Sequence, residues 1–588
     1  MKKYFIALWI LFPAGPSIAQ WSVKEGDPRA QDSNQYYLYQ VFSKAQWSAS
    51  NFATPGDMKW FSDARYGMFI HFGLNAFVNK DMSWPIVYDH KAPDSGHGSY
   101  PDSAWKKIWP GLFRLAKFNA GEWVKIAKDA GFKYIVIVVK HHDGFHMWDT
   151  KYADFKITNT PFKRDYLKEL VTACHKAGMR VGLYYSQRDW YHRDYAPVDT
   201  STLQRIAAPP YYKAKPGKTV VPGSSHKDYI AYQFNVVREL LTNYGKIDIF
   251  WFDAAWWGGM FTADMWDAEN LTRMIRKLQP GIIINNRTSL PGDFDTPEQR
   301  IGMFQLRPWE SAMTLNGSWG YEPSPVRPVK DLIAQMLKAA AGNGNVLLSW
   351  GAHFDGAFDE KQKDSLLKIG RWLKQFGVAY YGTRGGPWAP FRNYGAVYKG
   401  KRIFLYLFDW PNGSVSLPAL HNNRIVAARY VNIDEKTKWN TNGRHWIFHK
   451  PARPDATVTI IELKMTGTVQ ENAEMIKGSM FDDPVYGKKA VEKHIDENSW
   501  KGNRYRIDLP GHRMVTGLQT SSLSEKIEVF TSQDGIHWDP AGVVGNGTTE
   551  LSINELKTGA LVPGRRASFV LLQTKRPLRM KVTVYTVQ

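Results

Sequence analysis

The sequence has almost no cysteine: Cys174 is the only one in 588 residues. A single cysteine cannot form a disulfide within the chain, so a hydrophobic core must supply the stability of the fold. No GxGxxG or GxxxxGK[ST] phrase opens a helix, which argues against a nucleotide-binding function. Beyond the N-terminus, no apolar run approaches the ~20 residues that a membrane-spanning helix needs.

Acidic residues are scarce relative to basic ones. The chain has 55 Asp and Glu against 76 Lys and Arg, a formal net charge of +21. Such an excess favours an anionic partner: nucleic acid, a membrane surface or an acidic polysaccharide. With 43% hydrophobic and 22% charged residues, the composition is otherwise that of a globular protein, which excludes a mostly disordered or collagen-like chain.

The N-terminal segment has the features of a secretory signal. Met1 is followed by two lysines, a largely apolar stretch over residues 4–13 and small residues before Gln20. This order predicts a signal peptide at residues 1–19, cleaved after Ala19. An exported protein without disulfides fits a bacterial periplasm best, and export argues against nucleic acid as the anionic partner.

The central part of the chain alternates apolar runs with helical segments such as residues 120–130 and 166–177. Because the runs are continuous and rich in β-branched and aromatic residues, they indicate strands buried on both faces, as in a parallel sheet. We therefore predict an α/β fold with a (β/α)₈-like barrel over residues 20–384. The runs stand at residues 66–72, 134–139, 180–186, 247–253, 281–286 and 345–350.

The sequence after the predicted barrel alternates apolar and polar residues between Asn, Gly and Pro turns. This pattern predicts antiparallel β-sandwich domains, the first over residues 385–468. A second such domain is predicted over residues 469–588. Its phrase EVFTSQDGIHWDPAG, at residues 528–542, resembles a hairpin of discoidin-like (galactose-binding-like) modules.

Polar residues gather at the ends of the predicted strands. The active site of such a barrel lies at the carboxyl ends of its strands, and buried polar groups there are costly unless they are paired or used. We therefore interpret these ends as a functional site. They carry His71, His141, His142, Asp143, Tyr184, Tyr185, Trp251, Asp253, Asn286 and Arg287.

Catalysis by a pair of carboxylates is the chemistry that fits these strand-end residues best. Asp253 follows Trp251 on the same face of its strand, so an aromatic wall should flank a carboxylate. Glu298 and Glu310 stand in what reads as exposed loop sequence and are the candidate partners. A retaining glycosidase uses two carboxylates ~5–5.5 Å apart, one as nucleophile and one as general acid/base. The alternatives are purely structural roles. Asp253 would then cap the next helix, and Glu298 and Glu310 would be solvated glutamates in loops.

Two other chemistries are less well supported. A metal site would need converging ligands, but His141 and His142 are adjacent, and on a strand adjacent side chains point to opposite sides. We therefore expect no metal. A serine or cysteine nucleophile finds no support either, because the chain has no GxSxG phrase and Cys174 lies inside a predicted helix.

Several phrases, taken in order, resemble the α-L-fucosidases of glycoside hydrolase family 29. They are FIHFG at residues 69–73, HHDGF at 141–145, RVGLYYSQRDW at 180–190, FWFD at 250–253, NNR at 285–287, DTPE at 295–298 and WGY at 319–321. The resemblance implies a retaining mechanism without a cofactor, with Asp253 as nucleophile. It places the acid/base at Glu298, with Glu310 in reserve. It also implies a sugar pocket lined by His71, Trp84, His141, His142, Tyr184, Trp251 and Arg287.

The chain departs from the family pattern at two places. The usual Glu-Trp-Tyr after the first strand reads Met82-Ser83-Trp84-Pro85, so a sugar-contacting glutamate is missing or moved to Asp81. The usual NGNLLLN phrase reads NGNVLLS and ends at Ser349. The substrate is therefore expected to be a terminal α-L-fucose or the related α-L-galactose. A catalytically inactive sugar-binding protein is the alternative from another class.

A run of lysines suggests a more specific partner. Lys213, Lys215, Lys218 and Lys227 follow the third predicted strand, and loops after barrel strands open onto the active face. They would stand near the mouth of the pocket, where a sulfated algal polysaccharide would present its anionic groups.

Overall fold

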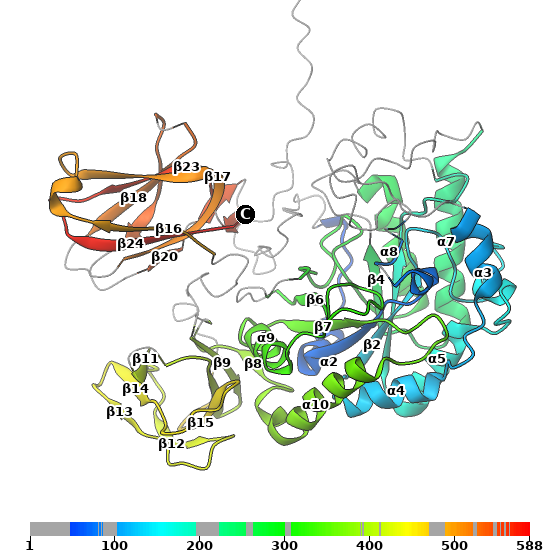
Figure 1. Cartoon of the computed structure of the whole chain (residues 1–588), viewed down its shortest axis with the longest axis horizontal. Coiled ribbons are helices and arrows are strands. Elements are labelled where there is room, and N and C mark those ends of the chain that lie inside the picture. Colours follow the sequence, from blue (N-terminus) through cyan, green and yellow to red (C-terminus); the bar gives the residue numbers. More distant parts are fainter. Residues whose placement is uncertain are drawn as a thin grey trace, which may run out of the picture.

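The computed structural model shows a barrel followed by two β-sheet modules (Figure 1). The residues that it describes are 48–79, 81–83, 85, 103–195, 223–253, 263–299, 301, 307–388, 390, 393–410, 413–469, 488–520, 526–534, 536–544, 550–552, 554–557, 560–563 and 565–587. The predicted signal peptide lies outside them. Among the described residues, no helix combines the length and apolar character needed to cross a membrane.

Seven parallel strands form the curved sheet of the barrel, in the order β5-β4-β3-β2-β1-β7-β6. Strand β2, for example, is buried at every position, as its continuous apolar sequence predicts. The predicted (β/α)₈-like fold class is thereby confirmed. The strands are β1 (Tyr66–Ile70), β2 (Tyr134–Lys140), β3 (Arg180–Ser186), β4 (Ile249–Asp253), β5 (Ile283–Ile284), β6 (Glu310–Thr314) and β7 (Asn345–Trp350).

Helices cover the outside of this sheet, and their ends follow from local sequence. In α5 (Tyr166–Ala177), the Asp165 carboxylate accepts the Lys168 N–H, and Gly178 ends the helix in the left-handed conformation. The predicted helix at residues 166–177 is therefore confirmed. The other α-helices here are α2 (Pro55–Ala64), α3 (Trp109–Leu112), α4 (Ala120–Asp129), α7 (His226–Asn243), α8 (Ala268–Leu278), α9 (Val329–Ala341) and α10 (Glu360–Phe376).

An irregular segment, residues 293–299, joins the two edges of the sheet. Isolated parallel bridges pair Phe294 with Asn285, next to β5, and Glu298 with Ala312 of β6. The segment therefore takes the place of an eighth strand. Gly292 precedes it with φ +60°, and a Cβ there would lie 2.2 Å from the Asn285 carbonyl oxygen, so the turn requires glycine.

Strand β6 corrects one expectation from the sequence. Glu310 begins this strand and is fully buried, not exposed in a loop. The sequence ESAMT has no run of large apolar residues, so its strand character is weak. Pairing with β7 and with the segment 293–299 buries it nonetheless.

The first module after the barrel is a β-sandwich, with a five-stranded sheet facing a three-stranded one. In β10, Phe404 and Tyr406 belong to the barrel core, whereas Ile403 and Leu405 belong to the core between the two sheets. Strand β10 is thus buried on both faces of its sheet. Its strands are β8 (Arg384–Gly385), β9 (Tyr394–Lys399), β10 (Arg402–Leu407), β12 (Ile425–Tyr430) and β15 (Thr459–Met465), and the smaller sheet has β11 (Ser414–Pro418), β13 (Trp439–Thr441) and β14 (His445–His449).

The last module is antiparallel and has a hydrophobic core of its own, which includes Val529, Val570 and Val584. Its resemblance to discoidin-like modules stays a prediction. Its strands are β16 (Lys488–Ile495), β17 (Arg504–Thr520), β18 (Ile527–Ser532), β19 (Asp539–Val544), β20 (Glu550–Ser552), β21 (Asn554–Lys557), β22 (Ala560–Pro563), β23 (Arg565–Gln573) and β24 (Met580–Val587).

Candidate active site

One guanidinium contacts both candidate carboxylates. Arg287, just after β5, donates from Nη1 to Asp253 Oδ1 at 2.9 Å and from Nη2 to Glu298 Oε2 at 3.0 Å. Burial alone would lower the pKa of Arg287, but the charges of Asp253 and Glu298 outweigh it and raise that pKa. The structure therefore brings Asp253 and Glu298, the pair that the family resemblance implies, together around one buried cation.

The closing segment holds Arg287 in place from its other side. The guanidinium also donates to the Thr296 hydroxyl and to the Thr296 carbonyl oxygen, at 3.0 and 3.1 Å. Asn286, predicted as a strand-end residue, accepts from the same hydroxyl at 2.9 Å. The position of Glu298 is thus set by main-chain pairing and by buried polar contacts two residues earlier in the chain.

Aromatic rings form one wall of the site. Tyr184 donates its hydroxyl proton to Asp253 Oδ2 at 2.6 Å and stacks on Trp251, with ring centroids 5.5 Å apart. The Arg287 guanidinium lies 4.9 Å above the Trp251 ring. Trp251 lies on β4, which ends at Asp253, and Tyr184 lies on the neighbouring strand β3.

Glu310 lies behind this wall. The Trp251 indole N–H donates to Glu310 Oε1 at 3.2 Å, and the Tyr134 hydroxyl donates to Oε2. Burial raises the pKa of Glu310 to about 7, although the hydrogen bonds from Tyr134 and Trp251 oppose the shift. Glu310 therefore contacts the back of the aromatic wall rather than the space beside Asp253.

Three histidines share one arrangement: their Nδ1 atoms lie within hydrogen-bond distance of a serine hydroxyl. The pairs are His71 with Ser349 at 2.7 Å, His141 with Ser83 at 2.7 Å and His142 with Ser186 at 2.6 Å. Sequence reasoning found the histidines but missed the serines, because a lone serine carries no pattern. The only signal was that Ser83 and Ser349 stand at the two departures from the family pattern.

Burial lowers the pKa of each of these imidazoles. The pKa of His71 falls to about 3 through burial. Burial also takes the pKa values of His141 and His142 well below the ordinary value, with smaller contributions from nearby imidazoles and cations. All three side chains are therefore neutral near pH 7, and each can offer one N–H donor and one acceptor nitrogen.

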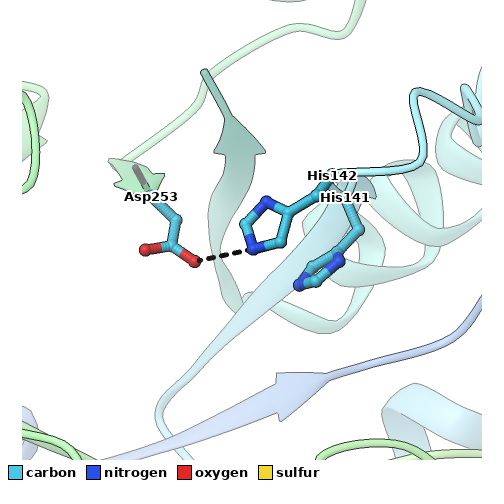
Figure 2. Close-up of side chains that lie close together, drawn as sticks. All are labelled: His141, His142 and Asp253. Carbon is cyan, nitrogen blue, oxygen red and sulfur yellow. Dashed lines mark ion pairs between the residues drawn. The ribbon is translucent and has the colours of Figure 1, made fainter. Parts of the chain in front are cut away.

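The two adjacent histidines correct the argument made from the sequence. Strand β2 ends at Lys140, so His141 and His142 lie in the following turn, and their rings are only 3.9 Å apart. Figure 2 shows both beside Asp253, with His142 Nε2 3.9 Å from its Oδ2. A ligand atom from each of the three lies within 4.8 Å of the others, so this set could hold a metal ion geometrically.

A third carboxyl group, that of Asp81, lies near Glu298. Burial raises the pKa of Asp81 to about 8, and the charges of Glu298 and Glu322 add to that shift. Asp81 therefore keeps its proton near neutral pH. A sugar contact by Asp81, which the sequence suggested as an alternative to a missing glutamate, stays a prediction.

The side chains of two further predicted residues contact groups other than the carboxylate pair. Asp143 accepts the Trp105 indole N–H at 2.7 Å, and the Tyr185 ring packs 4.8 Å from the Lys140 ammonium group. Both side chains are buried. Trp84 lies outside the described residues, as do Lys213, Lys215 and Lys218, whereas Lys227 is exposed in the first turn of α7.

Two carboxylates on one arginine, neutral imidazoles and an aromatic wall stand at the carboxyl ends of barrel strands. This is the class of site in which glycoside hydrolases cleave glycosidic bonds. A family model described as alpha-L-fucosidase matches residues 38–378, more than half of the chain. The chain belongs to this family, glycoside hydrolase family 29.

Individual relatives agree with this assignment. Human plasma alpha-L-fucosidase is 26% identical over 401 residues, which cover 64% of this chain and 80% of the relative. Alpha-L-fucosidase isoenzyme 1 from Paenibacillus thiaminolyticus is 29% identical, with a TM-score of 0.60 over 70% of this chain and 98% of that one. An alpha-L-fucosidase from Bacteroides thetaiotaomicron, solved as a trapped covalent intermediate with 2-fluoro-fucosyl fluoride in a Glu-to-Gln mutant, is 25% identical, with a TM-score of 0.61 over 71% and 98%.

Proposed function

We propose that the chain is an exo-acting, retaining glycosidase that removes a terminal α-L-fucose or α-L-galactose. In this proposal Asp253 is the nucleophile and Glu298 the general acid/base. The observation that carries it is the Arg287 guanidinium, whose two Nη atoms lie 2.9 and 3.0 Å from oxygens of the two carboxylates. Carboxylates on neighbouring nitrogens of one guanidinium can adopt the ~5–5.5 Å separation that retention requires.

The first chemical step forms a glycosyl-enzyme. Asp253 attacks the anomeric carbon while Glu298 gives its proton to the departing glycosidic oxygen. Arg287 and Tyr184 fix the two oxygens of Asp253 before the reaction, so little reorganisation is needed at the transition state.

The second step returns the enzyme to its starting state. Glu298, now ionised, takes a proton from a water molecule, which attacks the same carbon and releases Asp253. Two displacements at one carbon restore the original anomeric configuration. The covalent intermediate trapped in the Bacteroides relative supports the same sequence of steps for this chain.

The exposure of the two carboxylates supports this division of roles. The Asp253 side chain is 10% exposed, whereas that of Glu298 is 35% exposed. A nucleophile benefits from a fixed position, whereas an acid/base has to be reached first by the leaving-group oxygen and then by the attacking water. Glu310 is fully buried behind Trp251, which favours Glu298 over the reserve candidate.

The identity of the sugar is the finer part of the proposal. L-Galactose is L-fucose with a hydroxyl group on C6, so contacts to the ring hydroxyls alone accept both sugars. A hydrophobic pocket rejects an added hydroxyl only weakly, by ~10²-fold. Parallel kcat/KM measurements on aryl α-L-fucoside and aryl α-L-galactoside decide between them, and tight binding of both without turnover would favour the sugar-binding protein instead.

Metal-dependent hydrolysis at the His141, His142 and Asp253 set is the remaining rival. The Arg287 guanidinium already lies 2.9 Å from Asp253, and a divalent cation on the same carboxylate would be repelled by it. Activity should therefore survive exhaustive treatment with a chelator. Loss of activity that added metal restores would support the rival.

A further inference from the structure

Two serines are placed to decide which nitrogen of a neighbouring histidine carries the proton. A serine hydroxyl has one proton to donate and can accept from two donors, whereas a carbonyl oxygen can only accept. Counting donors and acceptors around Ser349 and Ser83 therefore assigns the tautomers of His71 and His141.

Ser349 is an acceptor toward His71. Its Oγ lies 2.8 Å from the Trp319 carbonyl oxygen, which must receive the hydroxyl proton. The same Oγ lies 2.7 Å from His71 Nδ1, so Nδ1 has to supply the proton of that hydrogen bond. His71 therefore carries its proton on Nδ1, and its Nε2 is left as an acceptor.

Ser83 acts in the opposite direction on His141. Its backbone N–H points at His141 Nδ1 at 3.4 Å, which requires a lone pair on that nitrogen. Its hydroxyl, 2.7 Å from the same nitrogen, accepts from the Asp143 N–H at 3.0 Å and is free to donate to Nδ1. His141 therefore carries its proton on Nε2, which is a donor.

We propose that Ser349 and Ser83 are positioning residues that hold His71 and His141 in opposite neutral tautomers, so that His71 accepts a hydrogen bond from the sugar and His141 donates one. The use of both histidines on a sugar rests on the proposed function. Both imidazoles are more than nine-tenths buried and both pack against Tyr184, with ring centroids 6.0 and 5.6 Å away. Burial keeps each imidazole neutral, so the difference between them is one of proton placement and not of charge.

This arrangement selects for hydroxyl groups. A hydroxyl facing His71 has to donate, and one facing His141 has to accept. Fluorine in place of a hydroxyl could still accept weakly from His141 but could not donate to His71. Ser349→Ala frees His71 to change tautomer and should lower kcat/KM about tenfold, the effect of losing one oriented hydrogen bond.

Neutron diffraction on crystals of the sugar-free full chain tests the tautomers directly. The expected result is deuterium on Nδ1 of His71 and on Nε2 of His141. The same tautomer in both residues, or the reverse pair, would overturn the proposal. Opposite tautomers in a protein that turns over neither aryl glycoside would leave the assignment standing and reject the proposed function.

Nitrogen-15 NMR of labelled histidines gives a second readout in solution. Ser349→Ala should shift the His71 ring nitrogens toward a mixture of tautomers and leave those of His141 unchanged. Ser83→Ala removes only the hydroxyl and keeps the backbone N–H that points at His141 Nδ1, so His141 should keep its proton on Nε2 in that variant. Ser349→Thr, which keeps the hydroxyl, should restore the His71 spectrum. Thr383→Val is the matched control, because it removes a buried hydroxyl bonded to the Tyr380 carbonyl at 2.7 Å and should change neither histidine. Unchanged His71 shifts in Ser349→Ala would contradict the assigned role.

Discussion

Single side chains set the charge of the pocket. Arg287 holds two carboxylates, while burial keeps His71, His141 and His142 neutral. The cation therefore contacts both carboxyl groups, and the imidazoles serve as hydrogen-bonding groups. This division fits a reaction in which one carboxylate attacks while the other moves a proton.

Asp253→Asn should lose turnover by at least about 10³-fold, as removal of an essential catalytic group does. The amide has the same shape but cannot attack the anomeric carbon, so the glycosyl-enzyme cannot form. The measurement is kcat on the better aryl glycoside, with circular dichroism as the check that the fold is kept. Near-normal turnover would remove Asp253 from its proposed role.

Glu298→Ala should affect substrates according to their leaving groups. An activated aryl glycoside needs little protonation as it departs, whereas an oligosaccharide loses the 10²–10⁴-fold that general acid catalysis provides. Added azide should partly restore turnover of the aryl glycoside, because a small anion can attack the intermediate without a base. If Glu310→Ala shows this pattern and Glu298→Ala does not, the role passes to Glu310.

The residues of the site were largely predictable, because histidine, aspartate and arginine at strand ends are unusual. Their partners were not. Ser83, Ser186 and Ser349 are ordinary residues whose importance depends on three-dimensional proximity. The mutual orientation of His141 and His142 was wrongly predicted, because the last residue of β2 decides whether they alternate or share a turn.

At the scale of elements, strand content was predictable wherever apolar residues run together. The runs that became β1, β2, β3, β4 and β7 all read as buried strands. Strand β6 and the segment 293–299 lack such runs and are ordered by pairing with sequence-distant partners. Strand β6 carries Glu310 and the segment 293–299 carries Glu298. Because the sequence did not reveal these two elements, it could not show which of the two glutamates lies beside Asp253.

Glu310 gives a pH-dependent test at this scale. Its folded-state pKa, about 7, exceeds its unfolded value, so this group destabilises the fold as pH rises from about 4.5 through 7. Glu310→Gln cannot ionise and keeps an acceptor for the Trp251 N–H. The free energy of unfolding of the variant, relative to wild type, should therefore be higher at pH 8 than at pH 5, by on the order of 1–3 kcal/mol. An equal difference at both pH values would show that folding does not raise the pKa of Glu310.

At the scale of the whole molecule, the sandwich shares the core of the barrel, whereas the last module has a separate core. The net charge of +21 is spread over all of these parts. Exposed charge pairs contribute only ~0.2–1 kcal/mol each and are screened by salt. Several such pairs could still attract an anionic polysaccharide, as the lysines after β3 suggest.

We accordingly predict that sulfated oligosaccharides ending in α-L-galactose or α-L-fucose are better substrates than their desulfated forms. The advantage in kcat/KM should shrink from low to high ionic strength, because salt screens the attraction. It should also shrink in the triple variant Lys213→Ala, Lys215→Ala and Lys218→Ala. Equal kcat/KM for both substrates at low salt would show that the basic charge does not contribute to substrate recognition.

The central claim is a double displacement through Asp253, and the anomeric configuration of the first product tests it most directly. Proton NMR can follow the sugar released from an aryl α-L-glycoside during the first minutes, before mutarotation mixes the anomers. The account predicts that the α-anomer appears first and the β-anomer only later. Initial release of the β-anomer would contradict it, because a single displacement by water inverts the anomeric carbon.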